Sequence, residues 1–395
     1  MIPAFSISRL PRIEFGRGKL ALLPKLVAGY GKHALIVTGA FSFRHSTHWP
    51  QLLNALTASG INYIDIRVTG EPSPQFIDDT IQQFHGSAFD VVIAIGGGST
   101  VDAGKAIAGL LKSEHSVMDY LEGVGPELNY SGPSIPFIAV PTSAGTGSEV
   151  TKNAVLSTQS AIGFKKSFRD EQLVAEYAII DPDLLDSCTP TMIAANGMDA
   201  FTQLLESLVS NKANAFTDAL AISGLEAANN GLLDWYLNRL DNPDAPALMA
   251  YAALLSGITL AQVGLGSVHG IASPLGAFFP IPHGVVCGTL VATATEVNIS
   301  ALSIRAPQHP ALKKYADTGR LLTKNYALDD LSAQQALVET LEHWTQCMAL
   351  PKLTDYGVTT QDIPRIVANS RGSSMKTNPI ILTDEEVGEI IRRRL

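Results

Sequence analysis

Cysteine is scarce in this chain, and clusters of basic residues are nearly absent. Three cysteines, Cys188, Cys287 and Cys347, are too few and too scattered for a disulfide framework or a cysteine-based zinc site, so we expect buried thiols. The 28 Lys and Arg residues are outnumbered by 37 Asp and Glu residues, and the net charge of −9 argues against a nucleic-acid partner. The N-terminus lacks the basic and apolar stretches of a signal peptide, which favours a cytoplasmic location.

Charge is absent altogether from residues 245–295, although 16% of the whole chain is charged. A membrane-spanning helix needs about 20 mostly apolar residues. This run, however, contains scattered polar residues and glycines, and Pro274, Pro280 and Pro282 interrupt it. We therefore expect no membrane partner. The run predicts helices at the centre of a large helical domain, with small residues where backbones approach closely.

The first half of the chain alternates short apolar runs with segments of helix length. Strands are predicted at residues 34–37, 61–68, 90–95 and 136–140, and helices at residues 51–59 and 77–85. This alternation is typical of a parallel sheet with crossover helices.

After Asp181 the pattern becomes helical, and no strand is predicted there. One helix carries an apolar face, which consists of Leu337, Val338, Leu341, Trp344 and Met348. Capping boxes are predicted at Ser332 with Gln335 and at Thr383 with Glu386. The fold class is therefore an α/β domain over residues 1–183 followed by an all-α domain over residues 184–395, with a ligand expected in the cleft between them.

Two glycine-rich turns follow predicted strands. Residues 96–105 (GGGSTVDAGK) come directly after a strand and open a helix, where backbone amides favour a phosphate group. The segment fails the Walker pattern because Ala106 follows the lysine, and it fails G-x-G-x-x-G because Val101 takes the place of the third glycine. A second such turn spans residues 141–149. Each could be a plain connection, but two at the carboxyl ends of one sheet favour a nucleotide site.

The second half contains a group of metal-ligand residue types. Asp199 and Gln203 share one face of a predicted helix, and His269 and His283 lie inside the uncharged run. We expect His269 to end one helix and His283 to start the next, which would bring both imidazoles to one point. Imidazole with carboxylate suits Fe²⁺ or Zn²⁺. The alternative for each histidine is a structural residue of the core.

These segments, together with Gly197-Met198-Asp199-Ala200 and Pro282-His283-Gly284, resemble the iron-containing (group III) alcohol dehydrogenase family over nearly the whole chain. The resemblance implies a Rossmann-like dinucleotide-binding domain and an all-helical metal and substrate domain, with a metal held in the cleft by one Asp and three His. It implies metal ligands at Asp199, His269 and His283, with Gln203 at the position of the remaining His. Ser273 stands where a further His near the nicotinamide is usual. Cofactor contacts are implied at Gly97, Gly98, Ser99, Asp102, Thr142, Ser143, Thr146 and Lys165.

Three departures from the family pattern matter. Gln203 is neutral and a poorer ligand than imidazole, which leaves metal occupancy open. Ser273, or water, would have to relay the proton. Gly39 stands where family members that use NAD commonly carry an Asp, and with Ser42 and Arg44 nearby a 2′-phosphate could be accommodated, so NADP is favoured over NAD.

The resemblance predicts an NAD(P)-dependent alcohol dehydrogenase or aldehyde reductase that acts on a small molecule, with Fe²⁺ or Zn²⁺ polarising the substrate oxygen, and a homodimer. One alternative keeps the fold without metal, as in maleylacetate reductases. Others are a nucleotide-binding protein with degraded catalysis, or a lyase like dehydroquinate synthase. The lyase would need basic phosphate-binding residues in the second half, and residues 245–295 have none.

Overall fold

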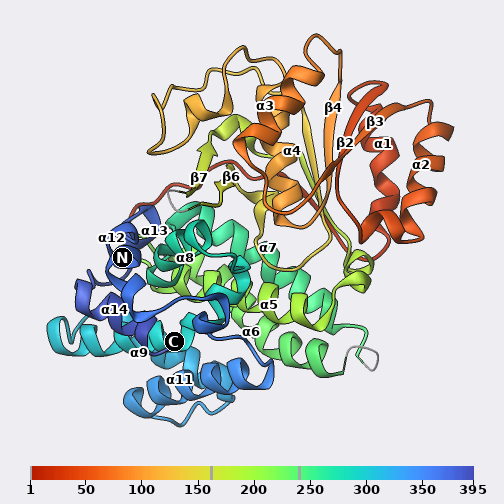
Figure 1. Ribbon diagram of the computed structural model, residues 1–395. Coiled ribbons are helices and arrows are strands. Elements are labelled where there is room, and N and C mark those ends of the chain that lie inside the picture. The colour runs from red at the N-terminus through yellow and green to blue at the C-terminus, as the bar shows by residue number, and fades with distance from the viewer. Residues whose placement is uncertain (1, 161–162, 239–241) are drawn as a thin grey trace.

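A parallel sheet and a helical bundle make up the protein (Figure 1). The computed structural model describes residues 2–160, 163–238 and 242–395. The sheet has the order β1-β8-β5-β4-β2-β3, and all its neighbouring strands are parallel. Its strands are β1 (Arg12–Phe15), β2 (His33–Gly39), β3 (Asn62–Val68), β4 (Val91–Gly96), β5 (Phe137–Pro141) and β8 (Tyr177–Ile180). The four predicted strands correspond to β2 through β5, so the predicted parallel sheet is confirmed.

Helices cover both faces of this sheet. They are α1 (Leu23–Ala28), α2 (His48–Ala58), α3 (Pro74–Gln83) and α4 (Gly98–Leu110). Alternate residues of β2 point to opposite faces: Ile36 packs in the cluster that contains Leu56 of α2, whereas Val37 packs in the cluster that contains Ile77 of α3. Strands buried on both faces read as continuous apolar runs, which is why these four could be predicted.

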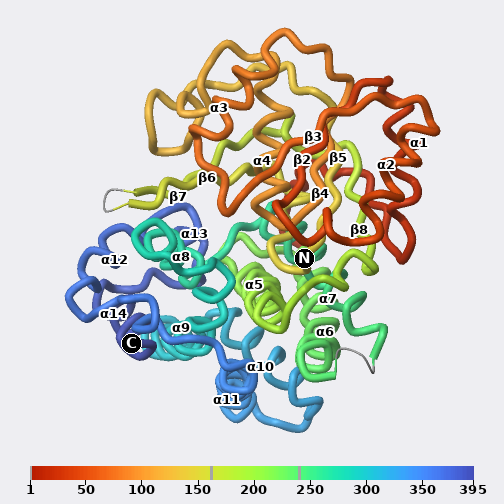
Figure 2. The backbone as a smooth tube through the Cα atoms, turned by 45° about the vertical axis from the view of Figure 1, so that its right-hand side comes forward, coloured from red at the N-terminus to blue at the C-terminus, as the bar shows by residue number. Residues whose placement is uncertain are grey.

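Four strands were not predicted. β1 and β8 are short, and β6 (Asn153–Thr158) pairs with β7 (Phe164–Arg169) in an antiparallel hairpin outside the main sheet. The sequence of β7 is FKKSFR, in which only Phe168 is fully buried, so it lacks an apolar run. Figure 2 shows the hairpin beside α8, where Ser273 Oγ donates a hydrogen bond to the backbone oxygen of Lys165.

The second half is helical throughout the part that the structure describes, as predicted. Its α-helices are α5 (Pro190–Val209), α6 (Ala215–Leu237), α7 (Ala245–Val263), α8 (Ser267–Phe278), α9 (His283–Arg305), α10 (Pro310–Thr323), α11 (Asp330–Cys347), α12 (Ile363–Asn369), α13 (Ser373–Lys376) and α14 (Asp384–Arg392). The short 3-10 helices of both halves are η1 (Lys19–Leu22), η2 (Phe43–His45), η3 (Val117–Tyr120), η4 (Ser148–Val150), η5 (Glu171–Leu173), η6 (Pro182–Ser187), η7 (Leu353–Tyr356) and η8 (Thr360–Asp362). The first residues of the chain also touch this half, because the Ser8 amide donates to Gln262 Oε1 of α7.

The uncharged run forms α7, α8 and the first half of α9. By length and composition α7 and α9 are apolar enough to cross a membrane, but 61% and 83% of their apolar windows are buried inside the protein. Core helices of a soluble protein pass the same test. Residues from both helices belong to the hydrophobic core of the helical half, so packing accounts for the absence of charge.

Local predictions had mixed outcomes. Thr383 caps α14 in a capping box with Glu386, as predicted. The predicted cap of α11 at Ser332 is wrong: Asp329 caps the helix by accepting a hydrogen bond from the Ser332 amide, so the helix begins three residues earlier than expected. Of the apolar face predicted in this helix, only Val338 is not fully buried. Of the three cysteines, Cys188 and Cys287 are buried and Cys347 is half-buried.

Two glycines let the helical half meet the sheet half at the level of the backbone. Gly147, in the turn after β5, has φ of 60°. A Cβ atom on Gly257 of α7 would lie 2.2 Å from the Gly147 oxygen and 2.7 Å from its Cα atom. No side chain fits in this gap. The prediction that small residues of the uncharged run mark close backbone approaches is thus confirmed at Gly257.

We predict that Gly257→Ala lowers the free energy of unfolding by about 1–3 kcal/mol, because the added methyl group forces α7 away from the turn. Alanine alone would stabilise a helix by about 0.5–1 kcal/mol, so a net loss reports the clash. Chemical denaturation monitored by circular dichroism measures it. Gly372→Ala is the control, since nothing lies within 4 Å of its Cβ position. Equal denaturation midpoints for the two variants would contradict the close approach.

Candidate active site

The N-terminus of α4 is built to receive an anion. Gly97 precedes the helix in an extended conformation and provides no side-chain cap, so the first amides of α4 are left for a ligand. A Cβ atom on Gly98 would lie 2.5 Å from Thr146 Oγ1 of the second turn. The two glycine-rich turns therefore touch, as their predicted positions at the ends of β4 and β5 require.

The second turn differs from the expectation in one respect. It opens the short 3-10 helix η4 and then strand β6, rather than an α-helix, so it supplies no helix N-terminus comparable to that of α4. Its contribution comes from side chains and from the closeness of its backbone to α4 and α7.

Lys105 holds the second turn against α4. Its ammonium group is fully buried and donates hydrogen bonds to the oxygens of Ser148, Thr151 and Asn153 at 2.6–3.1 Å. Burial lowers the pKa of Lys105 to about 8. Although the lysine of a glycine-rich turn often contacts phosphate, this one points into the protein. No role was predicted for Lys105, because its hydrogen-bond acceptors on Ser148, Thr151 and Asn153 lie more than 40 residues further along the chain.

Four side chains from three helices converge on one point. Asp199 comes from α5, His269 from α8, and His283 and Cys287 from α9. One donor atom of each lies within 4.8 Å of the others. Asp199 Oδ1 is 3.2 Å from His269 Nε2 and 3.8 Å from His283 Nε2. The predicted meeting of the two imidazoles with Asp199 is present, and Cys287 is an addition that the sequence analysis treated only as a buried thiol.

The placement of His269 was predicted wrongly. It lies in the first turn of α8 rather than at the end of a helix, while His283 is the first residue of α9, as expected. The reason is the pair of side chains that cap α8: Glu206 accepts from the amides of residues 266, 268 and 269, and Asn378 Oδ1 accepts from the Ser267 amide.

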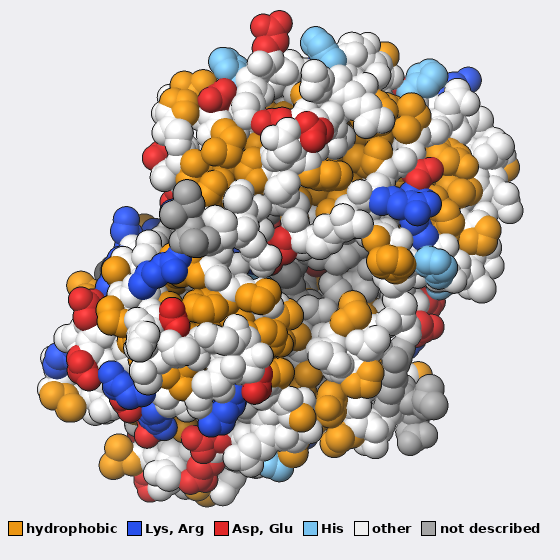
Figure 3. All heavy atoms as spheres, viewed as in Figure 1, with side chains coloured by type: hydrophobic (Ala, Val, Ile, Leu, Met, Phe, Trp, Pro, Cys, Tyr) orange, Lys and Arg blue, Asp and Glu red, His pale blue; other side chains and the backbone are white. Residues whose placement is uncertain are grey.

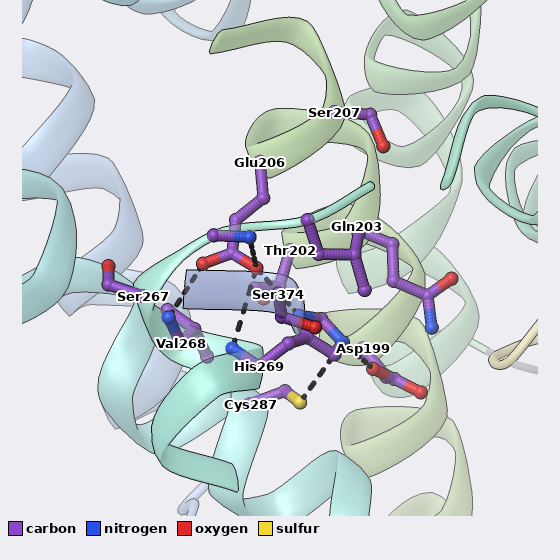
Figure 4. A network of polar contacts seen from close by, with 12 residues as sticks. Asp199, Thr202, Gln203, Glu206, Ser207, Ser267, Val268, His269, Cys287 and Ser374 are labelled. Atoms are coloured by element: carbon purple, nitrogen blue, oxygen red, sulfur yellow. Dashed lines mark hydrogen bonds and ion pairs between the residues drawn. The ribbon is translucent and has the colours of Figure 1, made fainter. Parts of the chain in front are cut away.

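Glu206 of α5 also fixes the orientation of the His269 ring (Figure 4). His269 Nδ1 lies 2.7 Å from Glu206 Oε2, and both side chains are buried. An ionised carboxylate only accepts hydrogen bonds, so Nδ1 carries a proton, and Nε2 is the ring nitrogen that faces Asp199. The sequence analysis missed Glu206, although it lies two helical turns after Asp199 on the same side of α5.

The electrostatics of this cluster favour positive charge between the donors. Burial opposes the ionisation of Asp199, but the His283 and His269 imidazoles outweigh it and lower the pKa of Asp199 to about 2. Burial would also lower the pKa of His269, but Cys287, Asp199 and Glu206 raise it well above its usual value. In a neutral His269, two acceptor atoms would face each other at 3.2 Å. Either a proton or a metal ion resolves this conflict, and the donor set suits a divalent transition metal.

Gln203 lies next to this cluster, but its side-chain oxygen is already engaged. Gln203 Oε1 accepts a hydrogen bond from Ser256 Oγ at 2.7 Å, and the residue is 3% exposed. In Figure 4 its amide group lies on the far side of Asp199 from Cys287. Its role as a ligand stays a prediction.

A cavity of about 530 Å³ connects the two glycine-rich turns to the metal-ligand cluster. Figure 3 shows a hollow between the upper and lower parts of the molecule. The predicted site residues that line the cavity are Gly98, Ser99, Asp102, Thr146, Lys165, Gln203, His269, Ser273 and His283. Lys165 pairs with Glu71 there, and burial together with the Lys165 ammonium group lowers the pKa of His283 to about 4. One cavity thus holds most of the predicted cofactor and metal positions.

Five predicted cofactor residues lie outside the cavity lining. Gly97, Thr142 and Ser143 lie beside it, and a Cβ atom on Gly97 would be 3.3 Å from Ser143 Oγ. Gly39 ends β2, and Ser42 is exposed just before η2.

Arg44 lies in the same region as Gly39. Its guanidinium group pairs with Asp65, lies 4.8 Å from the centre of the Trp49 ring, and donates to Thr38 Oγ1. Since Thr38 directly precedes Gly39, Arg44 places a positive charge near the end of β2.

Comparison with known proteins agrees with this geometry. The family model described as iron-containing alcohol dehydrogenase matches residues 11–182, and the one described as Fe-containing alcohol dehydrogenase family, C-terminal, matches residues 193–395. Lactaldehyde reductase of Escherichia coli is 33% identical over 361 residues, which cover 89% of each chain. NAD-dependent methanol dehydrogenase of Bacillus methanolicus is 29% identical over 391 residues, which cover 98% of each chain. A solved structure of a 1,3-propanediol oxidoreductase has a TM-score of 0.89 at 27% identity, with both chains fully covered.

We predict that Glu206→Gln lowers the free energy of unfolding by about 1–3 kcal/mol. The carboxylate accepts hydrogen bonds from the backbone amides at the start of α8, whereas the NH₂ group of glutamine would be a donor facing donors. The affinity for Zn²⁺ is expected to fall about 10- to 100-fold, since His269 loses its orienting partner. Thermal unfolding and competition with a chromogenic chelator measure the two effects. Glu226→Gln, an exposed change on α6, should alter neither. If both variants bind Zn²⁺ equally, Glu206 does not orient the ligand.

Proposed function

Since the chain belongs to the iron-containing alcohol dehydrogenase family, we propose that it binds a divalent metal ion at Asp199, His269 and His283 and prefers NADP. As a member of this family the protein is an oxidoreductase, which transfers a hydride between a nicotinamide cofactor and an alcohol or aldehyde. The observation that carries the metal proposal is the position of His269, whose protonated Nδ1 is held by Glu206 while Nε2 faces Asp199.

The residues present fit a metal ion in both chemistry and placement. Their donor atoms are mostly buried, come from three separate helices, and lie within 4.8 Å of one another. A divalent ion bound there, Fe²⁺ or Zn²⁺, supplies a Lewis acid that polarises the substrate oxygen. The protein's own contribution is to fix the donors: Glu206 orients His269, and the start of α9 places His283.

The residues around the cavity also fit a dinucleotide. The start of α4 has no side-chain cap, so its first amides can bind the pyrophosphate, and glycine at positions 97 and 98 lets the second turn approach them closely. A nicotinamide cofactor held there would supply or accept the hydride, and Ser273 and His283 line the same cavity. Ser273, which is half-buried in the cavity wall, is the residue we propose to pass the substrate proton to water.

The NADP preference is supported by charge at the end of β2. No carboxylate stands at Gly39 to repel a 2′-phosphate, the exposed Ser42 lies close by, and Arg44, which also pairs with Asp65, lies beside Thr38. One relative is named as NAD-dependent, so the proposed preference for NADP is argued from the residues of this chain and not from its family. A cytoplasmic homodimer is proposed on the family resemblance alone.

We predict that the purified protein oxidises NADPH in the presence of short aldehydes only when a metal ion is bound. Chelation should abolish turnover, and adding Fe²⁺ or Zn²⁺ should restore it. Asp199→Asn should lower kcat by about 100-fold or more, because the site loses its charged ligand. Absorbance of NADPH together with elemental analysis measures this. Full turnover by metal-free protein would favour the metal-independent reductase instead.

We predict that Gly39→Asp reverses the cofactor preference. A carboxylate there repels the 2′-phosphate and binds the ribose hydroxyls, and a Cβ atom fits because its nearest neighbour, Thr100 Oγ1, is 3.4 Å away. The KM for NADPH should rise about tenfold or more, equivalent to about 1.4 kcal/mol. Gly39→Ala adds the Cβ without the charge and should retain the preference. A wild-type enzyme that already favours NADH would contradict the assignment.

A further inference from the structure

We propose that the thiolate of Cys287 is the fourth protein ligand of the metal ion, so that the site consists of Asp199, His269, His283 and Cys287. This inference rests on the metal site proposed above. It gives Cys287, in place of Gln203, the role of the remaining protein ligand. The family pattern of one Asp and three His does not include a cysteine.

The distances fit one tetrahedral ion. With bonds of about 2.3 Å to sulfur and about 2.05 Å to nitrogen, a tetrahedral ion separates the two ligand atoms by about 3.5 Å. Cys287 Sγ lies 3.6 Å from His269 Nε2 and 3.8 Å from His283 Nε2. Nitrogen and oxygen ligands should be about 3.4 Å apart, and Asp199 Oδ1 is 3.2 Å and 3.8 Å from the same two nitrogens. These four distances between donor atoms match a tetrahedral site, and all four donors lie within 4.8 Å of one another.

The position of Cys287 in α9 explains this fit. Cys287 follows His283 by four residues at the start of the helix, so the two side chains lie one turn apart on one face. Its side chain is fully buried against the cluster. The other two cysteines have different surroundings: Cys188 Sγ lies near the backbone oxygen of Thr142, and Cys347 Sγ lies near the ring of His343.

Gln203 is the competing ligand, and its contacts argue against it. Its oxygen lies 2.7 Å from Ser256 Oγ, whose one proton also faces the backbone oxygen of Ala253 at 2.8 Å. Coordination through Gln203 would leave this oxygen shared between the metal ion and the Ser256 proton, whereas Cys287 Sγ faces the ring nitrogens of both histidines. This closeness of the sulfur to both imidazoles favours Cys287 over Gln203.

Charge balance favours the same assignment. Asp199 supplies one negative charge directly to a divalent ion, and Glu206 supplies another only through the His269 ring. A Cys287 thiolate adds its charge directly at the ion, whereas the neutral amide oxygen of Gln203 adds none. On binding, the metal–sulfur bond forms and the thiol proton is released to solvent. Because thiolate is a soft ligand, the site should favour Zn²⁺ or Co²⁺ over Fe²⁺ and Mn²⁺.

Spectroscopy of the cobalt form tests this assignment. One equivalent of Co²⁺ added to metal-free protein should give visible bands of tetrahedral cobalt and a near-ultraviolet band from thiolate-to-cobalt charge transfer. We expect the near-ultraviolet band to be lost in Cys287→Ser and retained in Cys188→Ser and Cys347→Ser. The affinity of Cys287→Ser for Zn²⁺ should fall by more than about 100-fold, because loss of a residue that only hydrogen-bonds to a metal ligand already lowers metal affinity by about 10- to 100-fold.

Two further measurements test the role of Cys287 even if the Cys287→Ser variant folds poorly. X-ray absorption of the zinc-loaded wild-type protein should show one sulfur at about 2.3 Å from the metal. Adding Gln203→His to Cys287→Ser should restore much of the zinc affinity without the near-ultraviolet band, because it supplies the imidazole of the family pattern.

The outcomes separate this proposal from the function on which it rests. Stoichiometric metal that is lost in Asp199→Asn but shows no sulfur ligand would overturn the role of Cys287 and leave the metal site in place. Failure of the wild-type protein to bind Co²⁺ or Zn²⁺ at all would overturn the metal site itself.

Discussion

The carboxylate of Glu206 is the contact on which the geometry of the site most depends. It satisfies the backbone amides at the start of α8 and, with the same oxygens, holds Nδ1 of His269. Helix starts leave unpaired amides that must find partners when buried. Here that requirement is met from α5, the helix that also carries Asp199, so the folding of α8 and the orientation of its imidazole toward Asp199 depend on one another.

A second buried charge, Lys105, does the same for the sheet half. Its ammonium group joins α4 to the turn after β5 and to the start of β6. This turn also contacts α7, because the backbones of Gly147 and Gly257 lie so close together that neither position has room for a side chain. The nucleotide end and the metal end of the cavity are therefore linked through the backbone, and a shift of one displaces the other.

Much of the fold could be predicted, because β2 through β5 are buried on both faces and read as apolar runs. The hairpin of β6 and β7 was missed because Lys165 and Lys166 of β7 line the cavity and only Phe168 of this strand is fully buried, which leaves no apolar run. Glu206 was missed because its partners lie some 60 residues further along the chain, beyond the reach of any local pattern. Cys287 is different: its four-residue spacing from His283 was visible, but a lone cysteine in an apolar run is more often a core residue.

The arrangement of the cluster gives a physical reason for the absence of charged residues from the uncharged run. Residues 245–295 supply His269, His283 and Cys287 to the cluster but contribute no permanent charge of their own. The field at the cluster is consequently set by a few groups from elsewhere: Asp199 and Glu206 of α5, and the pair of Lys165 and Glu71 at the cavity wall. In a buried site any further charge would act at full strength, because little water is present to screen it. The apolar neighbours from this run therefore leave the carboxylates of α5 to set the affinity for a cation.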